Sequence, residues 1–115
     1  RLGDEVIYNN LSDLKKDSSG ILFVYADWCS HCDASKDYIF SIHDKFPELD
    51  LFYFDSDVVD VEVYMERHNI DKLPYIGVIM DGGLLSGHGG ITYDDGGSAT
   101  AFFNDFEDYL SIVFD

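Results

Sequence analysis

The chain has 115 residues, of which 46% are hydrophobic and 16% aromatic. This length and composition suit one domain with a packed core, and the chain is too short for two. We therefore expect residues 1–115 to form a single domain. Seven Lys and Arg residues against 23 Asp and Glu residues give a net charge of −16, which disfavours binding to nucleic acid or to an anionic membrane surface. A basic partner or a heavily solvated acidic surface would each account for this charge. No apolar run has the length of a membrane span.

The first elements expected along the chain are a helix and a buried strand. Leu11 and Leu14 lie among polar residues, which indicates a short helix over 9–17, and Ser18-Ser19-Gly20 would end it. Residues 21–26 form a continuous apolar run, which is typical of a strand buried on both faces.

Two helices and a strand are expected next. Between residues 30 and 46, apolar residues recur at every fourth position, which predicts a helix ended by Pro47. Residues 51–54 predict a strand, and the apolar spacing across 57–68 predicts another helix. The first of these helices would carry one apolar stripe, formed by Ala34, Tyr38, Ile42 and Phe46 with Ile39 beside them.

The last part of the chain predicts a hairpin and a helix. The apolar segment 75–80, the turn Asp81-Gly82-Gly83 and the pair Leu84-Leu85 are typical of an antiparallel hairpin. In the final helix Asp105 and Asp108 would face outward. Its apolar stripe is expected to pack in the core and not to form a binding groove: Phe102, Phe106, Tyr109 and Val113. This element order predicts an α/β domain with a mixed sheet.

The chain's only two cysteines, Cys29 and Cys32, lie where the strand over 21–26 gives way to the helix. The amino end of a helix favours negative charge, so Cys29 can lose its proton at moderate pH and attack a disulfide. Cys32, one turn further along, can then displace the mixed disulfide. This spacing predicts a thiol–disulfide exchange site, which needs no metal or organic cofactor because the cysteine pair carries the electrons.

A metal site is the weaker interpretation of the same cysteines. A structural zinc site needs a second pair of ligands, which a lone CxxC lacks. The histidines show no ligand spacing with one another: His31, His43, His68 and His88. We therefore expect no metal.

The segment from Phe23 to Cys32 resembles the active-site strand and turn of the thioredoxin superfamily, which includes thioredoxins and protein disulfide isomerase domains. Leu73-Pro74, directly before the segment 75–80, is similar to the family's second hallmark, and Asp81-Gly82-Gly83 to its third. The resemblance implies a thioredoxin fold over nearly the full length, an α/β fold with a central mixed β-sheet flanked by helices. It also implies a thiol–disulfide oxidoreductase that acts on protein disulfides.

The resemblance also implies a role for each site residue. Cys29 would be the nucleophile and Cys32 the resolving thiol. Pro74 would follow a cis peptide bond and face the cysteines, and the backbone of Leu73 would hydrogen-bond the substrate. Trp28 would form part of the surface on which the substrate lies.

His31, between the cysteines, is where disulfide isomerases and bacterial oxidants of the superfamily carry a histidine. An imidazolium or imidazole N–H stabilises the Cys29 thiolate and hence the reduced form, which makes the disulfide a better oxidant. Asp27, Asp33 and Asp37 oppose this effect through like charge. Exposed charges are screened, so the sequence leaves the sign of the sum open.

Three positions depart from the family pattern. Phe23 stands where thioredoxins and disulfide isomerase domains usually carry a buried carboxylate that helps move the proton of the second cysteine. Tyr53 aligns with a thioredoxin lysine, and Ser30-His31 replaces Gly-Pro. Proton transfer from Cys32 would then fall to water or another group, and exchange near neutral pH would be slow. Three tyrosines are candidates for that group, although core packing is the stronger expectation for them: Tyr25, Tyr53 and Tyr75.

Several functions stay open at this point. If the chain is a thiol–disulfide exchange enzyme, His31 favours an oxidase or isomerase. The absence of a visible leader sequence favours a thioredoxin-like reductase. The alternative is an acidic thioredoxin-fold binding module with slow or vestigial redox chemistry that docks a basic partner. Glutaredoxin-like use of glutathione, suggested by Asp94-Asp95 after Gly89-Gly90, is weakest because two aspartates in a Gly-rich loop commonly form only a turn.

The expected partners follow from this chemistry. They are protein substrates with thiols or disulfides, together with a redox partner protein or glutathione, and neither nucleic acid nor a membrane. We expect a monomer. The chain begins with Arg1 and shows no secretory leader, so a cytoplasmic location and export with removal of a leader both stay open.

Overall fold

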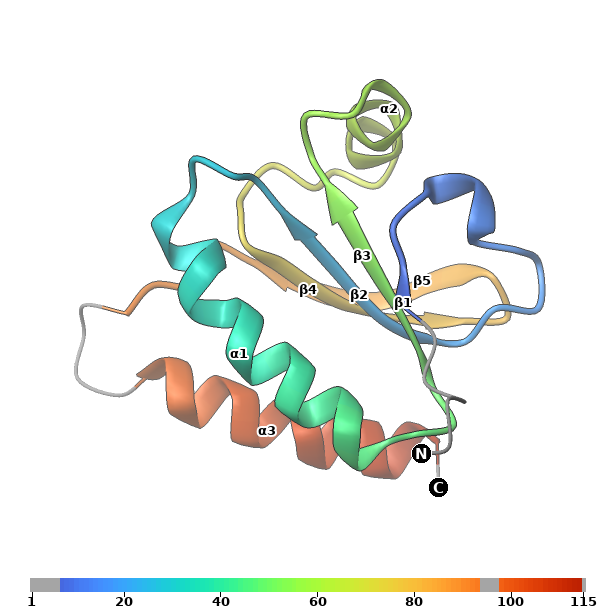
Figure 1. Cartoon of the computed structure of the whole chain (residues 1–115). Coiled ribbons are helices and arrows are strands. Elements are labelled where there is room, and N and C mark those ends of the chain that lie inside the picture. Colours follow the sequence, from blue (N-terminus) through green and yellow to red (C-terminus); the bar gives the residue numbers. More distant parts are fainter. Residues whose placement is uncertain (1–6, 94–97, 115) are drawn as a thin grey trace.

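The structure is a computed structural model that describes residues 7–93 and 98–114. Its centre is a five-stranded sheet in the order β1-β3-β2-β4-β5 (Figure 1). The strands are β1 (Ile7–Tyr8), β2 (Gly20–Tyr25), β3 (Asp50–Asp55), β4 (Tyr75–Met80) and β5 (Gly83–Gly89). The helices are a single 3-10 turn, η1 (Leu11–Asp13), and the α-helices α1 (Ser30–Lys45), α2 (Val59–Arg67) and α3 (Ser98–Val113).

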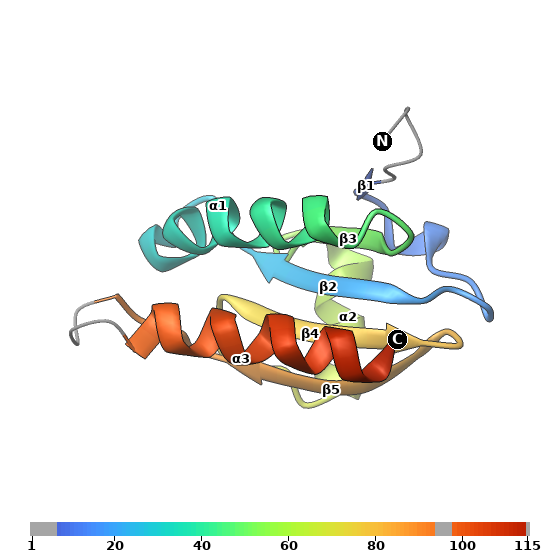
Figure 2. The same ribbon diagram turned by 90° about the horizontal axis from the view of Figure 1, so that it is seen from below.

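The sheet is mixed and is covered on both faces. Strands β1 and β2 run parallel to β3, whereas β4 is antiparallel to β2 and β5 is antiparallel to β4. Helices α1 and α3 lie on one face of the sheet and α2 lies on the other (Figures 1 and 2). This arrangement confirms the predicted α/β class with a central mixed sheet flanked by helices.

The central strand β2 supplies both cores, because successive residues of a strand point to opposite faces. Ile21 and Phe23 belong to the core beneath α1 and α3. Leu22 and Val24 belong to the core beneath α2. None of the four side chains has exposed surface, which explains why this segment is continuously apolar.

The predicted helix over 9–17 is wrong. Residues 7 and 8 form the edge strand β1, and only Leu11–Asp13 turn helically. The Ser18 hydroxyl accepts a hydrogen bond from the Lys15 N–H at 2.8 Å, which bends the chain back toward β2. Leu11 and Leu14 are half-buried against the core beneath α2. A single turn brings both leucines to that core, so their spacing does not require a longer helix.

Helix α1 begins and ends as expected, and its buried face includes Ile39 and Ile42 of the predicted stripe but not Ala34. Ala34 is exposed, and the buried positions of the helix are Cys32, Ser35, Ile39, Ile42 and His43. His43 is fully buried, and its Nε2 lies 2.8 Å from the Leu49 carbonyl oxygen. That contact joins the end of α1 to the segment that enters β3. His43 is therefore part of the core, although a pattern of apolar residues in the sequence does not include it.

The hairpin at the sheet edge confirms the turn prediction. Asp81 and Gly82 both have positive φ angles, 50° and 79°, and Met80 pairs with Gly83. This is the two-residue turn with left-handed central residues that suits the twist of a hairpin. Within the described ranges, no helix combines the length and hydropathy that a membrane crossing requires.

Candidate active site

Both cysteines lie at the amino end of α1, directly after the central strand. The Cys29 N–H donates to the Ala26 carbonyl at 3.1 Å, which closes a tight turn beyond β2. Cys29 is the N-cap of α1, and its Sγ accepts a hydrogen bond from the Cys32 N–H at 3.2 Å. Both residues are free thiols. The helix therefore directs a backbone donor and the positive end of its dipole at the Cys29 sulfur, which stabilises a thiolate there.

The two sulfurs differ in access to solvent. Cys29 is 9% exposed and Cys32 only 2%. Burial raises the pKa of the Cys32 thiol to about 12, and the hydrogen bond and charge of Cys29 and the charge of Asp33 act in the same direction. Cys29 is thus the sulfur that a substrate can reach, and Cys32 holds its proton.

Leu73, directly before Pro74, lies beside the cysteines. The Leu73–Pro74 peptide bond is cis, as the resemblance implies. Leu73 and Tyr25 pack against a small cluster formed by Ala26, Cys29 and Cys32. The fold therefore joins the start of α1 to the segment before β4, two regions far apart in the sequence.

His31 lies against a residue that the sequence analysis missed. Its ring stacks on that of Tyr93, with centroids 5.9 Å apart, and the Tyr93 hydroxyl lies 2.5 Å from Ser35 Oγ. This stack sets the position of the imidazole beside the start of α1. Tyr93 follows the Gly-rich end of the hairpin and belongs to no periodic pattern, so nothing in the sequence indicated it.

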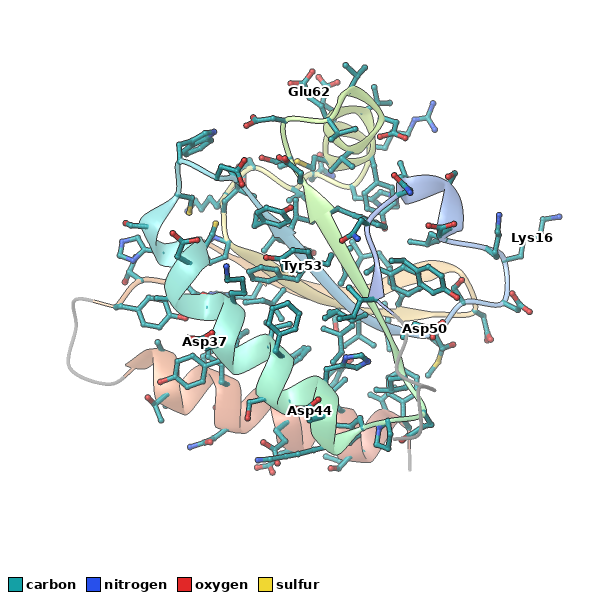
Figure 3. The ribbon with its side chains drawn as sticks, viewed as in Figure 1. Lys16, Asp37, Asp44, Asp50, Tyr53 and Glu62 are labelled. Carbon is teal, nitrogen blue, oxygen red and sulfur yellow. The ribbon has the colours of Figure 1, made fainter. Side chains whose placement is uncertain are left out.

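The position of the family's buried carboxylate is filled by an aromatic stack. Phe23 has no exposed surface, and its ring lies 5.5 Å from that of Tyr53 and 6.1 Å from that of Tyr25. The two tyrosine rings are 4.4 Å apart. Tyr53 lies beneath α1 (Figure 3), where Phe40 covers it. Aromatic rings thus surround the position at which the resemblance would place a carboxylate.

The tyrosines near Cys32 are poor proton acceptors. Burial, followed by the charges of neighbouring groups, raises the pKa of Tyr53 to about 12. Burial and the charges of Asp55 and Asp27 also raise the pKa of Tyr25. Tyr75, the third candidate, packs in the core beneath α2, on the other face of the sheet. These phenols are therefore protonated near neutral pH and cannot replace a carboxylate base.

Trp28 and Cys29 line the same groove. The Trp28 side chain is 72% exposed, so it is a surface residue and not a partly buried one. The groove has a volume of about 400 Å³. It is lined by Trp28, Cys29, Ser56, Asp57, Glu62, Met65, Glu66, Ile70, Asp71 and Leu73. The acidic residues from α2 and its flanking loops were not singled out by the sequence analysis, although the spacing of Glu62 and Glu66 already indicates one helix face.

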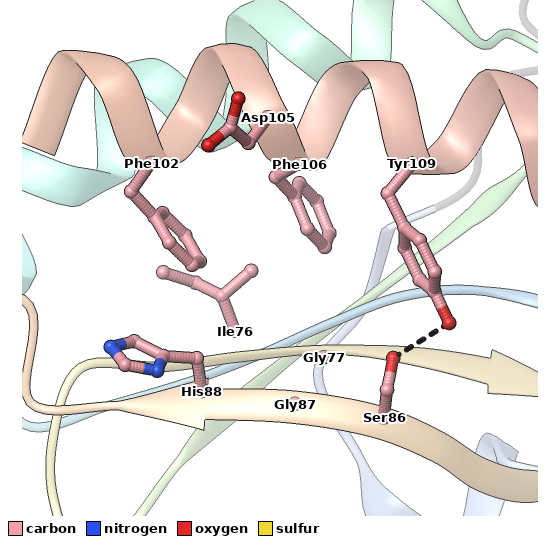
Figure 4. Close-up of a pocket in the computed structure, with 9 residues that line it drawn as sticks. All are labelled: Ile76, Gly77, Ser86, Gly87, His88, Phe102, Asp105, Phe106 and Tyr109. Atoms are coloured by element: carbon pink, nitrogen blue, oxygen red, sulfur yellow. Dashed lines mark hydrogen bonds between the residues drawn. The ribbon is translucent and has the colours of Figure 1, made fainter.

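A second pocket, of about 290 Å³, lies between α3 and the edge of the sheet. Phe106 belongs to the core, as predicted. However, Phe102, Phe106 and Tyr109 also line this pocket and point toward β4 and β5 (Figure 4). The Ser86 hydroxyl donates to the Tyr109 hydroxyl across it at 3.1 Å. The sequence did not predict the pocket, which opens because β5 is the last strand of the sheet.

The described residues give no support for a metal site or for the glutathione interpretation. Across residues 7–93 and 98–114, no group of three or more His, Cys, Asp or Glu side chains is placed to hold a metal ion. Asp94 and Asp95, on which the glutathione interpretation depended, lie outside the described residues.

The sheet order, the cysteine turn at the start of α1 and the cis proline before β4 define the thioredoxin fold. Solved structures with this fold match the chain over most of its length. Thioredoxin O2 from Arabidopsis thaliana has a TM-score of 0.72 at 13% identity, covering 100% of this chain and 98% of that one. A mutant thioredoxin from Halobacterium salinarum has a TM-score of 0.67 at 16% identity, covering 92% and 91%.

Thioredoxin f2, in its complex with ferredoxin:thioredoxin reductase, is similar to the same extent. Its structure has a TM-score of 0.71 at 11% identity and covers 96% of this chain and 94% of that one. No protein-family model matches the sequence, and no curated protein matches it either. At these identities the likeness shows the fold, and the function has to be argued from the site.

Proposed function

We propose that this protein is a thiol–disulfide oxidoreductase that acts on protein disulfides. The observation that carries this proposal is the Cys29 sulfur at the N-cap of α1, which accepts the Cys32 N–H at 3.2 Å beside the cis Leu73–Pro74 bond. A thiolate stabilised by backbone at a helix start, with a second thiol one turn away, is the arrangement that disulfide exchange requires.

The reaction proceeds in two exchange steps. The Cys29 thiolate attacks one sulfur of a substrate disulfide, forms a mixed disulfide and releases the other substrate sulfur as a thiolate, which takes a proton from water. The Cys32 thiolate then attacks the Cys29 sulfur, forms the Cys29–Cys32 disulfide and releases the second substrate thiolate. The substrate gains two electrons and the cysteine pair loses two. Run in reverse, the same steps place a disulfide in the substrate.

The neighbouring residues have supporting roles in this proposal. Leu73 offers its backbone to the substrate, Pro74 fixes the course of that segment, and Trp28 forms a surface on which the substrate lies. His31 adjusts the stability of the Cys29 thiolate. A redox partner protein or glutathione would restore the cysteine pair after each turnover; the complex of thioredoxin f2 with its reductase supports a protein in that role.

Reduction of insulin by dithiothreitol tests the proposal. The wild-type protein should accelerate the reaction, and the double variant Cys29→Ser, Cys32→Ser should not. If the double variant accelerates it equally, or if the wild-type protein has no effect at any pH, the proposed activity is wrong.

The direction of the chemistry depends on the reduction potential of the cysteine pair. Thioredoxin has a potential of about −270 mV and protein disulfide isomerase about −180 mV. A value near the first supports a reductase, and a value near the second supports an oxidase or isomerase. Equilibration in glutathione buffers, followed by alkylation and mass measurement, separates the two.

Replacing His31 by Ala is expected to lower this potential by on the order of 10–20 mV. The reason is that a charge at a helix terminus contributes about 0.3–1 kcal/mol and that 30 mV corresponds to about 1.4 kcal/mol for a two-electron couple. Loss of the imidazole removes stabilisation from the thiolate and so favours the disulfide. His88→Ala, at an exposed position of β5, is the matched control and should leave the potential unchanged. An unchanged or raised potential in His31→Ala would exclude the assigned role.

The release of the second substrate thiol should depend steeply on pH. The step needs the Cys32 thiolate. The pKa of Cys32 is raised to about 12 while Cys29 is free, with burial as the largest cause. In the mixed disulfide the hydrogen bond and charge of Cys29 are lost, and burial still keeps the pKa of Cys32 above that of an ordinary thiol. Its thiolate fraction therefore rises with pH, and the rate should increase about tenfold per unit between about pH 7 and pH 9. Stopped-flow measurement of the second product phase follows this step. A plateau below about pH 9 would show that Cys32 ionises like an ordinary thiol.

A binding module with slow exchange is the second candidate, and the aromatic stack at Phe23 favours it. With Phe23 buried and Tyr53 protonated, no carboxylate accepts the proton of Cys32 from that position. Such a protein would hold partners through its groove, and the cysteines would have little influence. The double cysteine variant distinguishes a binding module from an exchange enzyme. For a binding module, this variant would keep the binding to partners and the biological activity of the wild-type protein.

A further inference from the structure

The groove beside Cys29 has a charge that the exchange chemistry does not itself require. We propose that this groove selects substrates by charge, an inference that rests on the proposed function. The groove takes a peptide segment that carries Lys or Arg side chains next to its disulfide. The reactive sulfur and the carboxylates that would recognise such a segment share one cavity of about 400 Å³.

The carboxylates of the groove converge from three segments. Asp57 precedes α2, and its backbone N–H donates to Asp55 Oδ1 at 2.9 Å, which fixes the loop at the helix entrance. Glu62 and Glu66 lie one turn apart on α2, and Asp71 lies in the loop before Leu73. Because different elements contribute, the charge is a property of the groove and not of one solvated helix face.

Among the described residues, no cation of the protein occupies this groove, whose lining contains no Lys, Arg or His. The nearest lysine in sequence, Lys72, lies along Gly89 and Gly90 and contributes to a different pocket. The ion pair between Lys45 and Glu107 involves none of the groove carboxylates. The four groove carboxylates are exposed and available to a positively charged partner.

The rest of the lining suits the stem of a long basic side chain. Trp28, Met65, Ile70 and Leu73 supply apolar surface to the same groove that the carboxylates and Cys29 line. Lys and Arg side chains lay their aliphatic stems on such surface and keep the charged end in water. The exposed Trp28 ring also offers a face to a cation. An acidic substrate segment would find neither partner and would meet like charge.

The expected effect is on association, because exposed charges are screened and act mainly on the rate of encounter. The probes are two peptides of equal length, each with one cysteine activated as a 2-thiopyridyl disulfide. Lys and Arg flank the cysteine in one and Glu flanks it in the other. Release of pyridine-2-thione from excess peptide gives the rate constant for attack by reduced Cys29. At low salt the basic peptide should react at least about tenfold faster, and the ratio should fall toward one as salt is added.

Matched variants separate the groove from the net charge. Neutralising the groove carboxylates (Asp57→Asn, Glu62→Gln, Glu66→Gln, Asp71→Asn) should remove most of the preference. The control neutralises four exposed carboxylates elsewhere and changes the net charge equally: Asp17→Asn, Asp44→Asn, Glu48→Gln and Asp108→Asn. Figure 3 shows Asp44 on α1 and Glu62 on α2, on opposite faces of the sheet. Equal loss of preference in the two variants would overturn the assignment to the groove.

A small neutral reagent, the 2-thiopyridyl disulfide of 2-mercaptoethanol, keeps this inference distinct from the proposed function. If reduced wild-type protein fails to react with it faster than a free thiol does, the proposed function fails. If it reacts but treats the two peptides alike at low salt, the function stands and the charge selection is wrong. Because the salt dependence is measured on the wild-type protein, the preference for basic segments stays testable even if the variants do not fold.

Discussion

The Cys32→Ser protein is expected to stop after the first exchange step and to accumulate as a covalent adduct with its substrate. Cys29 retains its place at the N-cap of α1, so attack on the substrate disulfide continues. Serine at position 32 offers no thiolate to displace the mixed disulfide. Turnover in the insulin assay should fall on the order of a thousandfold or more. The two cysteines act together, so loss of the second nucleophile removes nearly all of the catalytic rate.

Non-reducing electrophoresis and mass measurement detect this adduct. Cys29→Ser is the matched control and should form none, because Cys32 is 2% exposed and holds its proton. If both single variants form adducts in equal amounts, the two cysteines are equivalent nucleophiles and the assigned order is wrong. If Cys32→Ser turns over at the wild-type rate, a thiol from solution resolves the intermediate.

The elements of this fold were predictable where a single periodicity decided them. Strand β2 is apolar throughout because both of its faces are buried, and α1 begins at the cysteine pair and ends before Pro47. The segment around Leu11 was not predictable, because two leucines at helical spacing also fit one 3-10 turn beside a sheet edge. What decided there was packing against α2's side of the sheet, which no local pattern reports.

The parts of the site that neighbouring residues form were predictable, and the contacts between distant segments were less so. The cysteine turn follows from a short motif, and the cis bond before Pro74 was implied by the resemblance to the thioredoxin superfamily. The contact of His31 with Tyr93 joins segments that only the folded chain brings together. The groove at Cys29 likewise depends on how α2 and the loop after it meet Trp28. No spacing in the sequence indicates the contact of His31 with Tyr93, and the spacing of Glu62 and Glu66 indicates a shared helix face but not the groove that they line.

Replacing Phe23 by Asp, which would restore the carboxylate of the family pattern, is expected to destabilise the protein and not to repair its exchange chemistry. Phe23 is fully buried among Tyr25, Tyr53 and the core beneath α1 and α3. Loss of a buried Phe side chain costs about 3–5 kcal/mol, and an unpaired buried carboxyl group adds several more. Domains of this size are stable by only about 5–15 kcal/mol, so the variant should be largely unfolded at room temperature.

Urea unfolding followed by circular dichroism measures the free energy of unfolding of this variant. Phe23→Leu is the control, since it keeps an apolar group at the site and should cost only about 1–2 kcal/mol. The outcome that would contradict the argument is a Phe23→Asp protein that stays within about 1 kcal/mol of the wild-type stability and releases the second substrate thiol faster near neutral pH. That result would mean that the stack of Tyr25 and Tyr53 rearranges to admit water. The expected result instead makes the aromatic stack a structural requirement of this chain, so the absence of a carboxylate at position 23 is a consequence of how the core is filled.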